Sequence, residues 1–204
     1  AASDVYKRQY AYYAPTSRFG SVADFQKLVD DLHQAGVGVI LDWTPAQFPR
    51  YASGLEKFDG TPLYERQNPA EAIHPFWGTL LYNYGSPMVK DFLISNACFW
   101  AEVYHADGLR MDDVDAMLYL DYGRNPGEWT PNIYGTNENL DALEFLKHLN
   151  SVIKERNPGL LLVAQENGLW PELTDSVEND HLGFDYKWSG GWTKDLLEYL
   201  SKDP

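Results

Sequence analysis

Cysteine is almost absent from this sequence of 204 residues, which contains only Cys98. A single cysteine excludes an internal disulfide and favours a cytoplasmic protein, because the cytoplasm keeps thiols reduced. Basic residues are also scarce, with 16 Lys and Arg against 30 Asp and Glu and a net charge of −14. This surplus of negative charge argues against nucleic acids and anionic membranes as partners, so we expect a neutral substrate.

Long apolar runs and cofactor motifs are missing as well. No segment approaches the roughly 18 consecutive apolar residues of a transmembrane helix, and the N-terminus lacks the apolar core of a signal peptide. The five histidines show no metal-ligand spacing, and no Gly-rich phosphate loop follows a predicted strand. We therefore expect neither a metal nor another cofactor. Residues 1–9 show no periodicity, as in a disordered or non-native segment, and stay unassigned.

The remaining chain alternates amphipathic helices with apolar strands. The pattern predicts helices over 21–36, 86–105, 140–157 and 193–200, and strands over 37–43, 107–114, 160–167 and 184–188. Four such alternations favour right-handed crossovers and a parallel sheet. The strands end in polar residues, followed by long aromatic-rich loops over 44–85 and 117–136. This one-sided arrangement is typical of a (β/α)8 barrel, of which four strands form only a part; a doubly wound open sheet is the alternative.

The stretch Asp107-Gly108-Leu109-Arg110-Met111-Asp112-Asp113-Val114 places charges at the end of an apolar strand. Arg110 and Asp112 are two residues apart, so their side chains share one face of the strand, and the guanidinium keeps the carboxylate ionised and aimed. This is how a carboxylate nucleophile would be presented, although a plain ion pair at a strand end fits equally well. Asp113 is expected to point the other way, as a helix-start or loop residue.

Several segments of 10–204 resemble the glycogen (1,4-α-glucan) branching enzymes of the α-amylase superfamily. They are YAPTSRFG at 13–20, VILDW at 39–43, FDGT at 58–61, WGT at 77–79, NYG at 83–85, DGLR at 107–110 and MLYLDY at 117–122. The last motif separates branching enzymes from the α-glucan hydrolases of the superfamily, which remain a third and weaker alternative.

The resemblance implies that 10–204 is part of the catalytic barrel, roughly its third to sixth strands, truncated at both ends. Asp112 matches the nucleophile, Arg110 the arginine that orients it, and Asp42 an aspartate of the substrate-binding site. The implied reaction is a retaining double displacement that cleaves an α-1,4 link in a glucan and transfers the chain to a 6-hydroxyl. The third catalytic carboxylate and the rest of the barrel would lie outside this chain, so we expect the isolated chain to be inactive and poorly stable.

Two positions depart from the family pattern. Gln47 replaces a histidine that would hold the reacting sugar, and Gln165 occupies the position of the general acid/base, which an amide cannot serve. Glu166 is the adjacent carboxylate, and it could substitute only if a bulge turned it to the other face. Two functional hypotheses follow: a branching enzyme, that is, a hexosyltransferase of glycogen biosynthesis, or a catalytically impaired homologue that binds glucan.

Overall fold

The computed structural model describes residues 11–51, 54–168 and 170–202, so the unassigned residues 1–9 lie outside the described part. The strands are β1 (Ile40–Trp43), β2 (Gln47–Phe48), β3 (Leu80–Leu81), β4 (Gly108–Met111), β5 (Leu161–Gln165) and β6 (Tyr186–Trp188). The helices are α2 (Val22–Gln34), α3 (Pro69–Ala72), α4 (Pro87–Val103), α5 (Val114–Leu118), α6 (Leu140–Arg156) and α7 (Gly190–Leu200), with a 3-10 turn at Val177–Asn179.

The main sheet is parallel, with its four strands in the order β1-β4-β5-β6. Within this sheet, each strand therefore lies beside the strand of the same sheet that comes before it in the chain. The order does not reverse as it does in a doubly wound sheet. The predicted α/β fold with a parallel sheet is confirmed, and the barrel alternative is favoured over the doubly wound one. All βα loops leave from the same edge of the sheet, where β2 and β3 form a small antiparallel pair.

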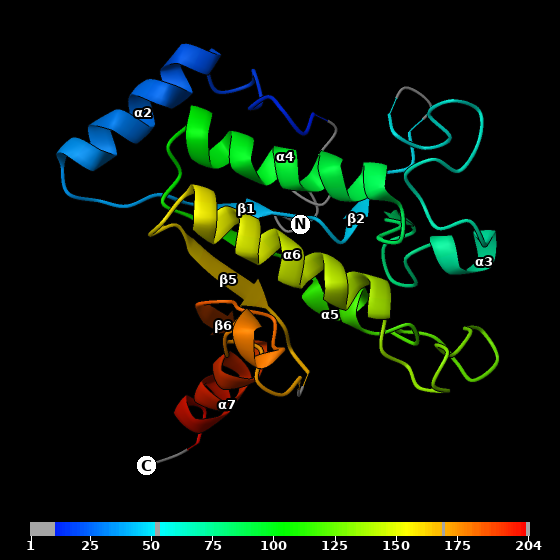
Figure 1. Cartoon of the computed structure of the whole chain (residues 1–204). Helices are drawn as coiled ribbons and strands as arrows, with labels where there is room; N and C mark the ends of the chain where they lie inside the picture. Colours follow the sequence, from blue (N-terminus) through cyan, green and yellow to red (C-terminus); the bar gives the residue numbers. More distant parts are fainter. Residues whose placement is uncertain (1–10, 52–53, 169, 203–204) are drawn as a thin grey trace.

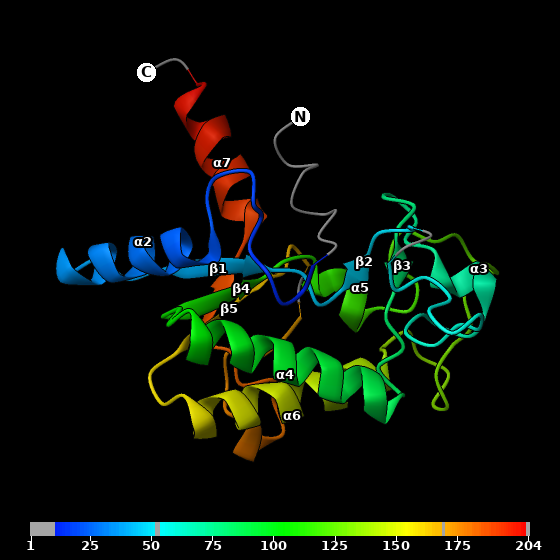
Figure 2. The same cartoon turned by 90° about the horizontal axis from the view of Figure 1, so that it is seen from above.

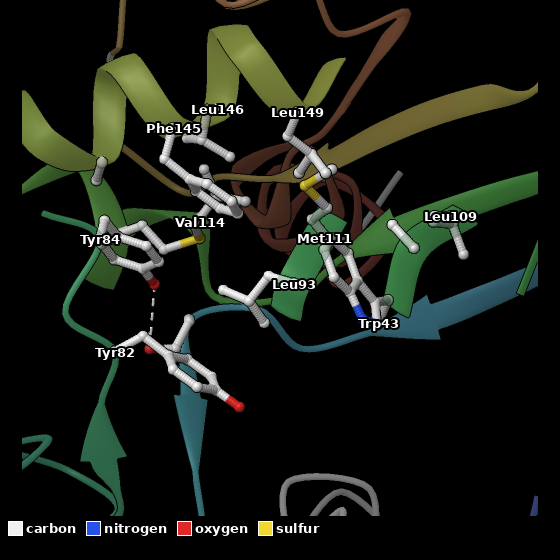
Figure 3. Packing of buried hydrophobic residues seen from close by; sticks show 14 of the residues in the cluster. Trp43, Tyr82, Tyr84, Leu93, Leu109, Met111, Val114, Phe145, Leu146 and Leu149 are labelled. Carbon is white, nitrogen blue, oxygen red and sulfur yellow. Dashed lines mark hydrogen bonds between the residues drawn. The ribbon is translucent and has the colours of Figure 1, made fainter. Parts of the chain in front are cut away.

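Helices α4 and α6 pack against each other on one face of the sheet (Figures 1 and 2). Between these helices and the strands lies a core that includes Leu93, Leu109, Met111, Phe145 and Leu149, each fully buried (Figure 3). On the other face the sheet is open, since alternate side chains of the edge strands are exposed: Ile40 by 49%, Tyr186 by 59% and Trp188 by 58%. A closed barrel would bury such a face.

Local sequence signals explain the first helix. Ser21 caps α2 by accepting a hydrogen bond from the Asp24 N–H, and the Asp24 carboxylate accepts one from the Ser21 N–H in return. The predicted helix over 21–36 is therefore confirmed. No helix within the described ranges is long and apolar enough to cross a membrane.

Several details differ from the sequence-based predictions. The strand predicted over 107–114 covers only Gly108–Met111, because Val114 begins helix α5. The first strand begins at Ile40 instead of Val37, and although its apolar run is typical of a buried strand, Ile40 is exposed, because the strand forms an edge of the sheet. The aromatic-rich loop expected from Met117 begins later, since Met117 and Leu118 close the short helix α5 and are buried. The long loop over 44–85 also contains the β2–β3 pair and helix α3.

Candidate active site

The guanidinium of Arg110 organises the carboxyl end of the open sheet face. Its Nε and Nη2 donate to the two oxygens of Asp42 at 2.6 and 2.8 Å, and its Nη1 donates to Oε1 of Gln165 at 2.6 Å. Asp42 is the register partner of Arg110 across β1 and β4, so the two side chains emerge side by side on one face. This two-pronged geometry is what an arginine makes with a carboxylate and a lysine does not.

Asp112 follows the last residue of β4 and returns to the same face as Arg110. Its Oδ1 lies 3.8 Å from Nη1 of Arg110, and the residue is only 1% exposed. The Arg110 guanidinium also lies over the ring of Trp188, 5.5 Å from its centroid. The structure thus brings together Asp42, Arg110, Asp112 and Gln165. Trp188 was missed by the sequence analysis, although its place at the end of a predicted strand was a usable signal.

Glu166 lies apart from this group. The pairing of β5 with β6 stays regular up to Gln165 opposite Trp188, so the next residue turns to the helix-covered face. There the Glu166 side chain is fully buried and forms an ion pair with Lys187. No bulge within the described strands turns Glu166 toward Arg110.

Glu166 shares its site with a second carboxyl, that of Asp115 in α5. The Asp115 oxygens accept hydrogen bonds from the backbone N–H groups of Asn167 and Gly168 at 3.0 and 3.3 Å. Burial, and then the neighbouring Glu166 carboxyl, raise the pKa of Asp115 to about 6. The two buried carboxyls and the partly exposed Lys187 therefore lie together directly behind the strand end that carries Gln165.

Asp113 is the centre of another buried polar group, one that the sequence analysis did not anticipate. Its Oδ2 accepts from Gln47 Nε2 at 2.7 Å and lies 2.8 Å from His74 Nε2, while its Oδ1 accepts from the Tyr122 hydroxyl at 3.4 Å. His74 Nδ1 accepts from the Phe76 N–H at 3.2 Å, so Nε2 carries the proton that is donated to Asp113. Asp113 precedes α5, as expected of a helix-start residue, but in the left-handed conformation with φ of 62°.

Gln47 is held at both ends of its side-chain amide. Its nitrogen donates to Asp113, and its oxygen accepts a hydrogen bond from the Thr79 hydroxyl. The residue is 2% exposed. Gln47 thus links the loop after β1 to the loop after β4 in this structure.

No group of three or more His, Cys, Asp or Glu side chains within the described ranges is placed to hold a metal ion. The open face presents carboxylate, guanidinium, amide and aromatic groups, which come from Asp42, Arg110, Gln165 and Trp188.

Comparisons with known proteins agree with this geometry. The chain is 55% identical over 194 residues to the 1,4-alpha-glucan branching enzyme GlgB of Thermobifida fusca, and 54% identical over 193 residues to that of Methylococcus capsulatus. Each match covers 95% of this chain and 26% of the relative, so the chain spans about a quarter of the length of these relatives. No protein-family model matches the sequence.

Solved structures show the same fold. A maltogenic alpha-amylase from Thermotoga neapolitana superposes with a TM-score of 0.66 at 13% identity, over 95% of this chain and 38% of the amylase. An Anoxybacillus alpha-amylase superposes with a TM-score of 0.65 at 17% identity, over 93% of this chain and 38% of that amylase. The chain is therefore a homologue of one segment of the 1,4-alpha-glucan branching enzymes, with the fold of part of an α-amylase barrel.

Proposed function

We propose that the whole protein acts on α-1,4-glucan as a branching enzyme and that this chain supplies the nucleophile side of its active site. The observation that carries the proposal is the arrangement around Arg110, which holds Asp42 and lies beside Asp112 at the carboxyl end of the sheet. The identity of 50–55% to branching enzymes over nearly the whole chain supports the same conclusion.

The proposed reaction is a retaining double displacement. A carboxylate oxygen of Asp112 attacks the anomeric carbon of an α-1,4-linked glucosyl unit, and the bond to the leaving oxygen breaks as that oxygen takes a proton from water at the open face. Arg110 keeps Asp112 ionised and aimed, because its positive charge stabilises the carboxylate form. The 6-hydroxyl of a second glucan chain then attacks the same carbon and gives its proton to water, the ester bond to Asp112 breaks, and an α-1,6 branch is formed.

We propose that Asp42 and Gln47 contribute to sugar binding in different ways. Asp42 reaches the open face, where its side chain is 46% exposed and can accept hydrogen bonds from sugar hydroxyls. Gln47 acts through the loops that it joins, since both ends of its amide already bind Asp113 and Thr79. The buried thiol of Cys98 fits our proposal of a cytoplasmic protein.

A second candidate function is glucan binding with little turnover. The specific observation in its favour is that Gln165 lies on the open face beside Arg110 and carries an amide, which cannot protonate a leaving oxygen. The family resemblance assigns the acid to this position. General acid catalysis contributes on the order of 10²–10⁴-fold. The two candidates therefore differ in rate, while both bind the same polysaccharide.

The test is an incubation of the full-length protein with amylose, with α-1,6 linkages counted by NMR. Asp112→Ala is the variant that removes the nucleophile, Gln165→Glu restores a carboxyl acid, and Asp91→Asn on the exposed face of α4 is the matched control. Branches from the parent that disappear in Asp112→Ala establish the branching enzyme. Branches only in Gln165→Glu establish the glucan-binding homologue, and no affinity for amylose in any variant refutes both.

A further inference from the structure

We propose that this site reacts with α-glucosyl donors whose leaving group departs without protonation, such as α-glucosyl fluoride, and that it retains the glucose on Asp112 as an ester. The inference rests on the proposed α-glucan function and adds the chemical class of donor. It follows from a site in which the nucleophile and its arginine are assembled while the position of the proton donor carries Gln165.

The first step balances without an acid. An Asp112 oxygen donates an electron pair to the anomeric carbon, and the carbon–fluorine bond breaks with its pair leaving as fluoride ion. A glucan donor differs, because its leaving group is an alkoxide of high basicity that must gain a proton as the bond breaks. Fluoride, the anion of a much stronger acid, has no such requirement.

Two carboxyls near the nucleophile are already committed to other partners. Both oxygens of Asp42 accept from the Arg110 guanidinium, which leaves neither to carry a proton to a sugar oxygen. Asp113 is buried and turned toward Gln47, His74 and Tyr122.

The remaining carboxyls of this region lie behind the sheet. Asp115 and Glu166 are 4% and 0% exposed, and Glu166 is paired with Lys187 on the helix-covered face. A proton on either group would have to cross the strand to reach a sugar on the open face. Within the described ranges, Gln165 is thus the residue placed where the donor would stand.

The same substitution slows the second step. A hydroxyl acceptor needs a base to remove its proton as it attacks the anomeric carbon, and the amide of Gln165 cannot serve as one. The ester on Asp112 therefore accumulates. An anionic acceptor such as azide needs no base: it attacks the anomeric carbon, the ester bond breaks, and the Asp112 carboxylate is regenerated.

The experiment uses the full-length protein with α-glucosyl fluoride as the probe. A fluoride electrode follows the first step, intact-protein mass spectrometry detects an added glucosyl unit, and NMR determines the configuration of the azide product. We expect fluoride release, a glucosylated protein, and α-glucosyl azide, because two displacements at one carbon retain configuration. Asp112→Asn, which keeps the size of the side chain, should abolish all three, and Asp91→Asn serves as the surface control.

The variant Gln165→Glu shows whether a donor needs a proton on its leaving group, because only amylose cleavage should gain from the new carboxyl. Its ratio of amylose cleavage to fluoride release should exceed that of the parent by about 10²–10⁴-fold, the usual contribution of a general acid. An equal ratio in parent and variant would overturn the inference, since a proton donor would then be present. No fluoride release from a parent that binds maltooligosaccharides would overturn it too, and would leave the glucan site intact. Absence of both fluoride release and oligosaccharide binding would refute the proposed function itself.

Discussion

The buried pair of Asp115 and Glu166 makes a prediction about stability that can be measured without any substrate. Asp115 has its pKa raised from the ordinary value of 3.8 to about 6, first by burial and then by the Glu166 carboxyl. The folded protein therefore holds this proton more tightly than the unfolded chain does. The stability that the proton provides is fully present below about pH 4 and is lost as the pH rises to about 6.

The replacement Asp115→Asn removes this loss. Two different Asp115 oxygens accept from the N–H groups of Asn167 and Gly168, at 3.0 and 3.3 Å. The single oxygen of an Asn can replace the one at 3.0 Å, so the variant gives up the weaker hydrogen bond from Gly168 but carries no charge that must be buried. The raised pKa corresponds to at most roughly 3 kcal/mol, because each pH unit is worth 1.36 kcal/mol. We expect the variant to exceed the parent in unfolding free energy by roughly 2–3 kcal/mol at pH 8 and by almost nothing at pH 4.

The assay is urea unfolding of the full-length protein, followed by tryptophan fluorescence at several pH values between 4 and 8. Asp91→Asn, an exposed Asp on α4, serves as the control for the change in net charge. A variant that is less stable than the parent at pH 8 would refute the reasoning. It would mean that Asp115 is ionised in the folded state and that its negative charge strengthens the hydrogen bonds from the N–H groups of Asn167 and Gly168.

Three further variants test separate parts of the structure. Phe145→Ala empties a fully buried position stacked on another ring and should cost roughly 3–5 kcal/mol in urea unfolding. Gly168→Ala places a methyl group against the Glu166 carboxylate, so the same measurement should show a loss of roughly 1–3 kcal/mol. Arg110→Lys keeps the charge but cannot donate paired hydrogen bonds to both Asp42 oxygens. It should slow fluoride release from α-glucosyl fluoride at least about ten-fold.

How much of the fold could be predicted depended on the range over which each signal acts. The start of the helix predicted over 21–36 was located correctly because the two residues that cap it, Ser21 and Asp24, are only three residues apart. Helix α5 was missed, since five residues are too few to display a 3.6-residue period. The exposure of Ile40 was missed for a different reason: a strand pattern does not reveal whether a neighbouring strand is present.

In the candidate site, too, features set by neighbouring residues could be predicted, and features set by distant residues could not. Alternation along a strand was enough to predict that Arg110 and Asp112 share a face and that Gln165 and Glu166 do not. The network around Asp113 could not be predicted, because two of its partners lie 39 and 66 residues away along the chain. Nothing in the local sequence distinguishes a buried aspartate with such partners from one at an ordinary helix start.

The hydrogen bond from Arg110 Nη1 to Gln165 Oε1 has a consequence for the evolution of the protein. A glutamate has nearly the same shape as glutamine and presents an oxygen at the same place, so a glutamate at position 165 requires no change in packing. The codons for the two amino acids differ only in their first base. A single point mutation therefore exchanges the amide at position 165 for a carboxyl group while the oxygen facing Arg110 stays in place.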